Sequence, residues 1–438
     1  MLGNIALYLR SKYYEPIVRE QDEFYNQNWT IDDINSWQLK KINQLWLEIT
    51  EQIPYFYNLS RRLKLPGEFS SLKKFKEALP ILDRKMIQNN KKLFNNNKRI
   101  SDFYRTTGGS TGQPIQIPSC NYELKYANKD YWYARSWFGI TPSDKLFLIW
   151  GHTHTLGNGF RGWLNKNKYN FKDYLLGYHR YSAYELSDVS LARAAQDLIK
   201  YNPDYIISYS VALDRFVRVN KNNKKYFHDL KLKAAIATAE SFPRDDSAEL
   251  ISEVLGCPVV MEYGTVETGP VAHQKLNGRY QVFWRHNLVE SIESESFPGK
   301  HEIIITTLYP RYFPLIRYKV GDFISKNQGG NPFYQEFDEV IGRCNDFIEL
   351  RDGSLIHSEA FTHALKNNTS IDSYQIEQKN QKELNLYYTA RNRLNDDEIN
   401  EIRRKLSLIH PLLGDIAMLK VNNLEQTIAG KIKFVISN

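Results

Sequence analysis

The alternation of apolar runs with helical segments between residues 146 and 263 constrains the fold of this chain more than any other feature. Runs typical of buried strands occur at 146–150, 205–209, 232–238 and 259–263. Helical segments such as 188–201 and 247–255 separate them, and Gly256 suits the position just after the second helix. Strands that alternate with helices of about 12 residues indicate βαβ units. The sequence therefore predicts an α/β fold built around a parallel sheet.

The ends of these strands are where a ligand site is expected, because ligands of open α/β sheets bind beyond the carboxyl ends of the strands. Glu240 lies just after one predicted strand. Gly264 and Thr265 follow Tyr263 at the end of the next strand. We therefore expect these residues to lie at one rim of the sheet.

The segments on either side of this region differ in character. Residues 1–60 show the three- and four-residue spacing of an amphipathic helix. The chain becomes rich in strand-like segments from residue 280, and residues 343–438 combine alternating apolar residues with helical stretches. We expect mixed sheets and helices in a large N-terminal domain, residues 1–342, and a small α+β C-terminal domain, residues 343–438.

Composition excludes several classes of protein. The 438 residues are 42% hydrophobic and 25% charged, typical of a soluble globular protein, and the net charge of +8 comes from scattered basic residues. Such scatter favours a solvated surface over a nucleic-acid interface. Cys120, Cys257 and Cys344 lie far apart, which argues against a zinc ribbon or a disulfide framework. Without a signal peptide or a run of about 18 apolar residues, we expect a cytoplasmic protein with no membrane span.

A run of hydroxyls and glycines is the first candidate for a functional motif. It comprises Thr107, Gly108, Gly109, Ser110, Thr111 and Gly112 and ends at Pro114. Glycines let the backbone turn its N–H groups into a concave cradle, and hydroxyls add donors, so the run suits phosphate oxygens. A flexible surface loop is the alternative interpretation. The spacing and the lack of a lysine exclude a Walker A loop.

Polar residues near the predicted strands are candidates for a substrate pocket. His152 and His154 follow the run 146–150 and would share one face of an extended strand. They are possible metal ligands, but no third ligand is evident nearby, so pocket lining is the preferred interpretation. His179 and Tyr209 are further candidates, and their polarity favours a polar substrate over a fatty one.

Taken together, the motifs resemble those of the adenylate-forming enzymes. Residues 107–114 fit the phosphate-binding loop of that family, except that Gln113 stands where many members carry lysine. Three further segments follow in the family's order: 262–270 resembles its Y-G-x-S/T-E motif, 317–322 its R-Y-x-x-G-D motif and 342–348 its G-R-x-x-D-x-I motif. Residues 429–432 match the S-G-K motif near the family's C-terminus.

The resemblance implies a role for each motif residue. Tyr263 would stack on adenine, Glu267 would coordinate Mg²⁺, and Asp322 would accept hydrogen bonds from the ribose hydroxyls. Arg343 would contact ribose or phosphate beside a hinge at residues 343–346, and Lys431 would bridge the acyl carboxylate and the α-phosphate. The expected ATP contacts are Thr107, Gly108, Gly109, Ser110, Thr111, Gly112, Glu240, Tyr263, Gly264, Thr265, Asp322 and Arg343, and the expected catalytic residues are Lys431, Glu267 and Arg343.

Within that superfamily the chain is similar to the phenylacetate–CoA ligase branch and its CapK-type capsular-polysaccharide relatives. The resemblance implies a ligase that uses ATP and Mg²⁺ to convert a carboxylic acid into an acyl-adenylate. The acyl group would then pass to a thiol or to an amine such as a sugar-linked amine. The pathway implied is surface-polysaccharide biosynthesis. A CoA ligase and a non-catalytic scaffold are the alternatives, with coenzyme A as co-substrate in the first. Glu349 replaces a lysine frequent in acyl-CoA-forming members and would repel the phosphates of coenzyme A if it lay near them, which argues against thioester formation and leaves the choice between amine and thiol open.

Overall fold

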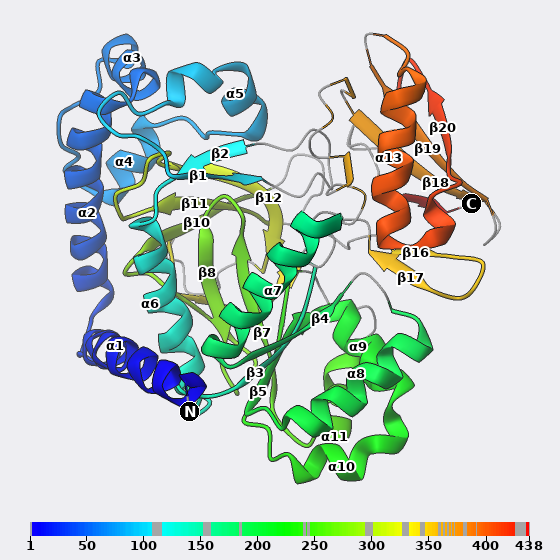
Figure 1. Cartoon of the computed structure of the whole chain (residues 1–438). Helices are drawn as coiled ribbons and strands as arrows, with labels where there is room; N and C mark the ends of the chain where they lie inside the picture. The colour runs from blue at the N-terminus through cyan, green and yellow to red at the C-terminus, as the bar shows by residue number, and fades with distance from the viewer. Residues whose placement is uncertain are drawn as a thin grey trace.

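The computed structural model confirms the α/β fold, with mixed sheets and helices along the chain (Figure 1). The described residues are 2–106, 116–151, 159–183, 186–239, 242, 246–293, 301–325, 333–341, 347–357, 361, 364–365, 368, 370–371, 373–379, 383–390, 392–424 and 435–437. None of the helices in these ranges is both long and apolar enough to cross a lipid bilayer.

The central sheet has eight strands in the order β14-β9-β8-β7-β6-β5-β3-β4. Its parallel half consists of β3 (Leu146–Trp150), β4 (Tyr178–Ser182), β5 (Tyr205–Tyr209), β6 (Ala235–Thr238) and β7 (Val259–Thr265). Its antiparallel half adds β8 (Gly269–Gln274), β9 (Tyr280–Val282) and β14 (Glu336–Phe337). All four predicted strands are therefore present, although the predicted strand 232–238 begins only at Ala235. Strand β4 was not predicted, because its half-buried polar residues lack the apolar character of an inner strand.

Helices cover both faces of the parallel half. Buried side chains alternate along the strands, so that Phe147 and Ile149 face one core while Leu146 and Leu148 face the other. The first core is closed by α8 (Asp188–Tyr201), α9 (Ser210–Val219), α10 (Lys224–Asp229) and α11 (Ser247–Leu255), with η3 (Lys221–Asn223) between α9 and α10. Gly256 ends α11 with a φ of +69°, as its position predicted. The second core contains Trp132 of α6 (Glu123–Ser136). Helix α1 (Leu2–Tyr25) packs beside it (Figure 1).

The N-terminal helices lie against a second, five-stranded sheet. Its order is β13-β10-β11-β12-β15, with β10 (Asn287–Glu293), β11 (His301–Thr307), β12 (Tyr318–Ile324), β13 (Phe333–Tyr334) and β15 (Val340–Ile341). The helices are α2 (Ile31–Gln52), α3 (Pro54–Leu63), α4 (Leu72–Ala78) and α5 (Arg84–Asn89), followed by η1 (Lys91–Phe94). The strand expected at 314–318 starts instead at Tyr318, because Arg317 has a φ of +48° and breaks the extended backbone.

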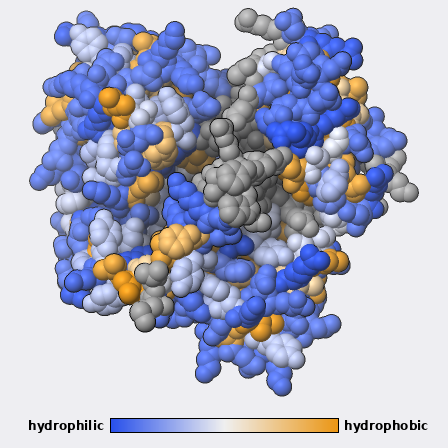
Figure 2. All heavy atoms as spheres, in the orientation of Figure 1, coloured by the Kyte–Doolittle hydropathy of each residue, from blue (hydrophilic) through white to orange (hydrophobic). Residues whose placement is uncertain are grey.

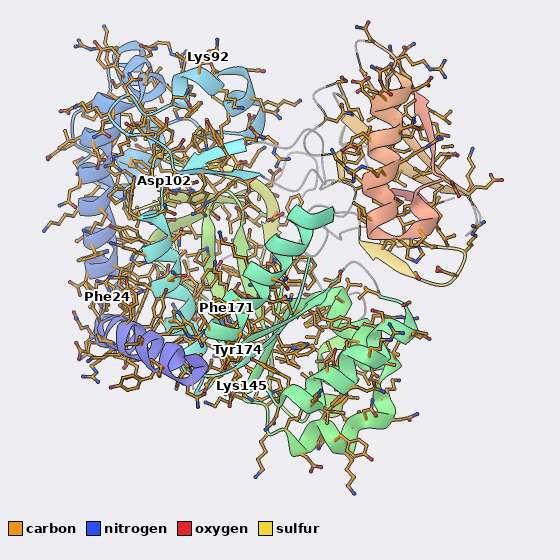
Figure 3. All side chains as sticks on the ribbon, in the orientation of Figure 1. Phe24, Lys92, Asp102, Lys145, Phe171 and Tyr174 are labelled. Atoms are coloured by element: carbon orange, nitrogen blue, oxygen red, sulfur yellow. The ribbon has the colours of Figure 1, made fainter. Side chains whose placement is uncertain are left out.

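The remaining elements frame the sheets. Strands β1 (Phe103–Thr106) and β2 (Gln116–Ser119) pair antiparallel, so the glycine-rich run joins two paired strands as expected. Helix α7 (Gly159–Leu176) crosses in front of the central sheet, and Phe171 and Tyr174 project from it (Figure 3). Beyond the central sheet lie β16 (Phe347–Glu349), β17 (Leu355–His357), β18 (Ser373–Lys379), β19 (Glu383–Thr389), α13 (Asp396–Ile409), η4 (Pro411–Leu413), β20 (Ala417–Lys420) and β21 (Val435–Ser437). Four of these strands form a sheet in the order β20-β19-β18-β21.

Candidate active site

The turn between β7 and β8 lies at the carboxyl rim of the central sheet and is held by close backbone packing. A Cβ atom on Gly264 would lie 2.5 Å from the carbonyl oxygen of Gly269, so only glycine fits where the two strands meet. Gly269 itself has a φ of +77°, a backbone region that favours glycine. The glycines of the Y-G motif region therefore serve the tight β7–β8 turn.

Two threonines fix the shape of this turn. The backbone N–H of Thr268 donates to Oγ1 of Thr265 across 3.1 Å, and their hydroxyl oxygens lie 3.0 Å apart. Thr268 in turn donates its hydroxyl to the carbonyl of Gly269. Glu267 lies inside this loop and is only 7% exposed. The turn thus places a carboxylate in a defined position at the rim.

Glu267 contacts two partners from distant parts of the chain. Nη2 of Arg84 lies 3.3 Å from Oε1 of Glu267, and the hydroxyl of Tyr318 lies 3.4 Å from the same oxygen. Arg84 is the first residue of α5, whose N-terminus is capped by the Asp83 carboxylate. The sequence did not reveal Arg84, because a single basic residue after a turn carries no motif. The signal available was only the Leu-Asp turn at 82–83 that precedes it.

Tyr263 and Asp322 connect the two best-defined motifs. The hydroxyl of Tyr263 donates to Oδ2 of Asp322 across 3.0 Å. Tyr263 is 8% exposed and meets the ring of Phe337 edge-on, with 6.2 Å between the ring centroids. Asp322 is half-buried on β12, so the Y-G motif of one sheet faces the R-Y-x-x-G-D motif of the other.

Arg317 of that second motif has a structural role. Its guanidinium pairs with Glu290 at 2.7 Å and donates to the backbone carbonyls of Lys76 and Leu79. The backbone of Arg317 also pairs with Leu82, whose N–H donates to the Arg317 carbonyl at 2.9 Å. These contacts anchor the segment just before Arg84. Arg317 therefore positions the site without facing the ligand.

Two of the predicted pocket residues are described and lie at different ends of the strands. Tyr209 is the last residue of β5, pairs with Thr238 of β6, and packs against Trp150 with 4.7 Å between ring centroids. It therefore lies at the carboxyl rim. His179 pairs with Phe147 near the start of β4, away from that rim. Burial lowers the pKa of His179, and Asp197 lies 3.9 Å from its Nε2 atom.

Several predicted site residues lie outside the described residues. They are Thr107, Gly108, Gly109, Ser110, Thr111, Gly112, Glu240, His152, His154, Arg343 and Lys431. The described chain reaches them on both sides: β1 ends at Thr106, β2 begins at Gln116, and β6 is followed by Ala239 with a φ of +73°. Their assigned roles stay predictions.

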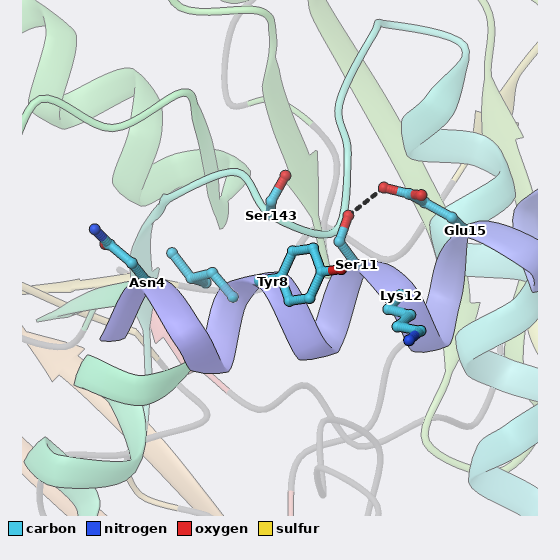
Figure 4. Close-up of a pocket in the computed structure, with 7 residues that line it drawn as sticks. Asn4, Tyr8, Ser11, Lys12, Glu15 and Ser143 are labelled. Atoms are coloured by element: carbon cyan, nitrogen blue, oxygen red, sulfur yellow. Dashed lines mark hydrogen bonds between the residues drawn. The ribbon is translucent and has the colours of Figure 1, made fainter. Parts of the chain in front are cut away.

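Other concave surfaces of the described residues do not contain the motif residues. One pocket runs along α1 and includes Tyr8, Ser11, Lys12 and Ser143, with the Ser11 hydroxyl donating to Glu15 (Figure 4). The face of the molecule shown in Figure 2 is largely hydrophilic, with apolar side chains in small separate patches. The rim that carries Tyr263, Glu267 and Asp322 is therefore the candidate site.

Comparisons with known proteins bear on the fold of the chain. No protein-family model matches the chain. The protein CapK of Staphylococcus aureus is 22% identical over 441 aligned residues, which cover 97% of this chain and 92% of CapK. The structure of 2-hydroxyisobutyryl-CoA ligase with 2-HIB-AMP and CoA in the thioesterification state has a TM-score of 0.59 at 16% identity, covering 93% of this chain and 90% of that chain. The same ligase in an open conformation gives a TM-score of 0.55, covering 92% and 91%.

Because the two alignments cover 92% and 93% of this chain, the structural match includes both the large sheets and the C-terminal elements. It confirms the fold predicted from the motifs. The chain therefore shares the fold of 2-hydroxyisobutyryl-CoA ligase and is similar to CapK along almost its entire length, which agrees with its resemblance to the adenylate-forming enzymes and their CapK-type branch.

Proposed function

We propose that this chain is an AMP-forming ligase that activates a carboxylic acid with ATP and passes the acyl group to an amine or a thiol. The observation that supports it most is the hydrogen bond between Tyr263 and Asp322 beside the buried carboxylate of Glu267. A flat ring, a diol acceptor and a metal-binding carboxylate are the three groups that a nucleoside triphosphate requires from such a rim.

Tyr263 and Asp322 would each have a part in holding ATP. Tyr263 offers a ring to the adenine base, and its hydroxyl keeps Asp322 in place. The carboxylate of Asp322, which accepts from Tyr263 at Oδ2, is the group assigned to the ribose hydroxyls. The glycine-rich loop that joins β1 and β2 would cradle the phosphates.

Magnesium fits the donor chemistry of this rim. Glu267 is a hard oxygen ligand, and the described residues hold no group of three or more metal-ligating side chains, so phosphate and water oxygens would complete the coordination. When bound, the ion neutralises phosphate charge. Arg84 contacts the same carboxylate and adds a fixed positive charge next to it.

The reaction would proceed in two steps. A carboxylate oxygen of the acid attacks the α-phosphorus of ATP, the bond to the bridging oxygen breaks, and pyrophosphate leaves. Lys431 would bridge the two anionic reactants in this step, whose catalysis is mostly positioning and charge neutralisation. The amine or thiol then attacks the acyl carbon of the acyl-adenylate and loses its proton. AMP is the leaving group.

The change between steps would come from rotation of the small C-terminal domain, residues 343–438, about a hinge at 343–346. Such hinge steps depend on a few residues at element ends. We assign the protein to the cytoplasm, with no nucleic-acid partner. The likeness to CapK supports a place in capsular or surface-polysaccharide biosynthesis.

The direct test is pyrophosphate release with ATP and Mg²⁺ over a panel of carboxylic acids. Each acid is assayed alone, with coenzyme A and with amino sugars, beside Lys431→Ala as the inactive control. Acid-dependent release that the control lacks is expected. Faster turnover with coenzyme A but not with amino sugars would assign the chain as a CoA ligase. No pyrophosphate release with any acid would contradict the proposal.

A further inference from the structure

A group of polar side chains lies directly behind the β7–β8 turn. A Cβ on Gly269 would lie 3.9 Å from Nη1 of Arg105 and 3.8 Å from the hydroxyl of Tyr309. Gly269 follows Glu267 by two residues, and the Tyr309 hydroxyl donates to the carbonyl of Thr268 between them. Arg105 therefore lies against the backbone of the candidate active site.

Three more side chains complete this group, which we term the polar cluster: Arg105 of β1, Tyr131 and Arg135 of α6, and Glu262 of β7. Nη2 of Arg135 lies 4.0 Å from Oε2 of Glu262, and its guanidinium carbon lies 5.4 Å from the centre of the Tyr131 ring. Burial raises the pKa of Tyr131, with the Glu262 charge acting in the same direction and the charges of Arg135 and Arg105 opposing it. Tyr131, Arg135 and Glu262 therefore lie side by side, and Arg105 lies behind the neighbouring β7–β8 turn.

The hydrogen-bonding groups of the polar cluster are not satisfied by the described residues. Nη2 of Arg105, Nε of Arg135 and Oε2 of Glu262 are buried atoms with no hydrogen-bond partner there. The side chains of these residues are only 10–14% exposed. A buried donor or acceptor without a partner costs about 1–3 kcal/mol, and more when charged. Three such atoms call for a polar group that the described residues do not supply.

The nearest carboxylate cannot serve Arg105. Glu123 lies 3.8 Å from Nη2 of Arg105, which is too long for a hydrogen bond. Its Oε1 already accepts from the N–H groups of Cys120 and Tyr312, and its Oε2 accepts from Nε of Arg311. Two guanidiniums therefore share one fully used carboxylate.

The cluster offers both unmatched donors and an unmatched acceptor. A hydroxyl is a small neutral group that can donate to Glu262 and accept from an arginine or a tyrosine at the same time. A carboxylate or phosphate would be repelled by the negative charge of Glu262, and an ammonium would be repelled by the two arginines. The mixture of charges therefore selects a neutral hydroxyl over a second ionised group.

We propose that the acid activated by this chain carries at least one hydroxyl group, which Arg105, Tyr131, Arg135 and Glu262 bind. This inference rests on the proposed ligase activity and specifies its substrate class. A plain aliphatic or aromatic acid of the same size would leave the buried polar groups unpaired. Sites that hydrogen-bond a substrate hydroxyl reject the analogue that lacks it strongly.

The test compares acids in matched pairs that differ only by hydroxyl groups: butyrate with 3- and 4-hydroxybutyrate, phenylacetate with 4-hydroxyphenylacetate, and hexanoate with gluconate. The readout is kcat/KM for pyrophosphate release. For at least one pair we expect the hydroxylated acid to be preferred by about 100-fold or more. Equal or better use of the plain acid in every pair that reacts would overturn the inference alone. No pyrophosphate release with any acid would overturn the ligase activity and, with it, the inference.

Variants locate the preference in the polar cluster. Glu262→Leu removes the acceptor and should reduce the preference for the hydroxylated acid to within about tenfold, mainly by slowing that acid. Tyr131→Phe keeps the ring and should reduce the preference in the same direction. Tyr126→Phe, the same change on α6 where the ring stacks on Tyr309, is the matched control and should leave the preference unchanged. A preference that survives both cluster variants, with folding verified by circular dichroism, would contradict the assignment.

Discussion

The hydroxyl of Tyr263 donates to the carboxylate of Asp322 across 3.0 Å and so joins the central sheet to the five-stranded sheet at the candidate active site. The two residues lie 59 positions apart in the chain. Their bond means that the residue facing the base also orients the residue facing the ribose. Loss of either side chain should therefore weaken the binding of the same ligand.

Tyr263→Phe tests this coupling. It keeps the ring and removes the hydroxyl, so we expect KM for ATP to rise about 10- to 150-fold, matching a lost hydrogen bond to a charged group of about 1.5–3 kcal/mol. Asp322→Asn should raise KM for ATP at least as much. The double variant should show less than the product of the two single effects, because both remove the same bond. Independent, multiplicative effects would contradict the coupling.

Arg84 is predicted to position Glu267. Arg84→Gln removes the positive charge 3.3 Å from that carboxylate, so we expect kcat/KM to fall about tenfold. The Mg²⁺ concentration for half-maximal activity should also shift, an effect that a merely structural role would not produce. Lys85→Ala, an exposed neighbour on the same helix, is the control and should change neither value. An unchanged Mg²⁺ dependence in Arg84→Gln would exclude the positioning role.

The tight β7–β8 turn predicts that Gly264 tolerates no side chain. In Gly264→Ala the new Cβ would meet a backbone oxygen at 2.5 Å, so the turn must move. We expect a loss of about 1–3 kcal/mol in the free energy of unfolding, together with loss of most activity. Gly67→Ala is the matched control, because no atom lies within 4 Å of its Cβ position, and it should stay within about 0.5 kcal/mol of the unchanged protein. Urea titration of both variants decides the matter.

The buried pair of Arg317 and Glu290 predicts a stability effect away from the ligand. Arg317→Met would leave the Glu290 carboxylate, which is 0% exposed, without its 2.7 Å partner. Breaking one side of a buried ion pair costs about 3–5 kcal/mol. Arg317→Met with Glu290→Gln should recover part of this loss. A single variant that unfolds at the same urea concentration as the unchanged protein would contradict the structural role of Arg317.

His273 of β8 predicts how stability depends on pH. Burial lowers the pKa of His273 to about 4, and its Nδ1–H donates to the carbonyl of Gln274. The unfolded chain therefore takes up a proton near the ordinary histidine pKa of about 6.5 while the folded protein does not. Its contribution to stability is present above pH 6.5 and is lost as the pH falls toward 4, at up to about 1.4 kcal/mol per pH unit.

Comparison with His273→Gln isolates this term from other titrating groups. The slope of the free energy of unfolding between pH 6.5 and 4.5 should be smaller in the variant than in the unchanged protein. Equal slopes would show that His273 titrates normally in the folded state.

The sequence predicted the sheet and the motif order because both depend on local signals. Apolar runs such as 146–150 mark inner strands wherever they occur, and glycine at position 256 marks a helix end. Strand β4 was missed because half-buried polar residues carry no such signal. The strand that follows Arg317 begins only at Tyr318, because Arg317 has a positive φ and its side chain contacts Glu290 and Lys76, and no local pattern encodes those contacts.

The candidate site was predicted only where a motif marks it. Tyr263, Glu267 and Asp322 belong to motifs, and a hydrogen bond joins Tyr263 to Asp322. Arg84 and Arg105 do not belong to motifs, because their roles arise from distant segments folding onto the β7–β8 turn. Glu262 is a particular case: it precedes Tyr263, yet the alternation of β7 directs its side chain to Arg135 of α6.

The central claim is that the acid becomes joined to AMP, and oxygen-isotope transfer tests it most directly. The acid is supplied with ¹⁸O in its carboxylate, together with ATP, Mg²⁺ and the acceptor that supports turnover. Attack of the carboxylate on the α-phosphorus predicts one ¹⁸O atom in the AMP released and none in pyrophosphate. Label in inorganic phosphate, with ADP as the other product, would contradict adenylation and assign the chain to acyl-phosphate chemistry instead.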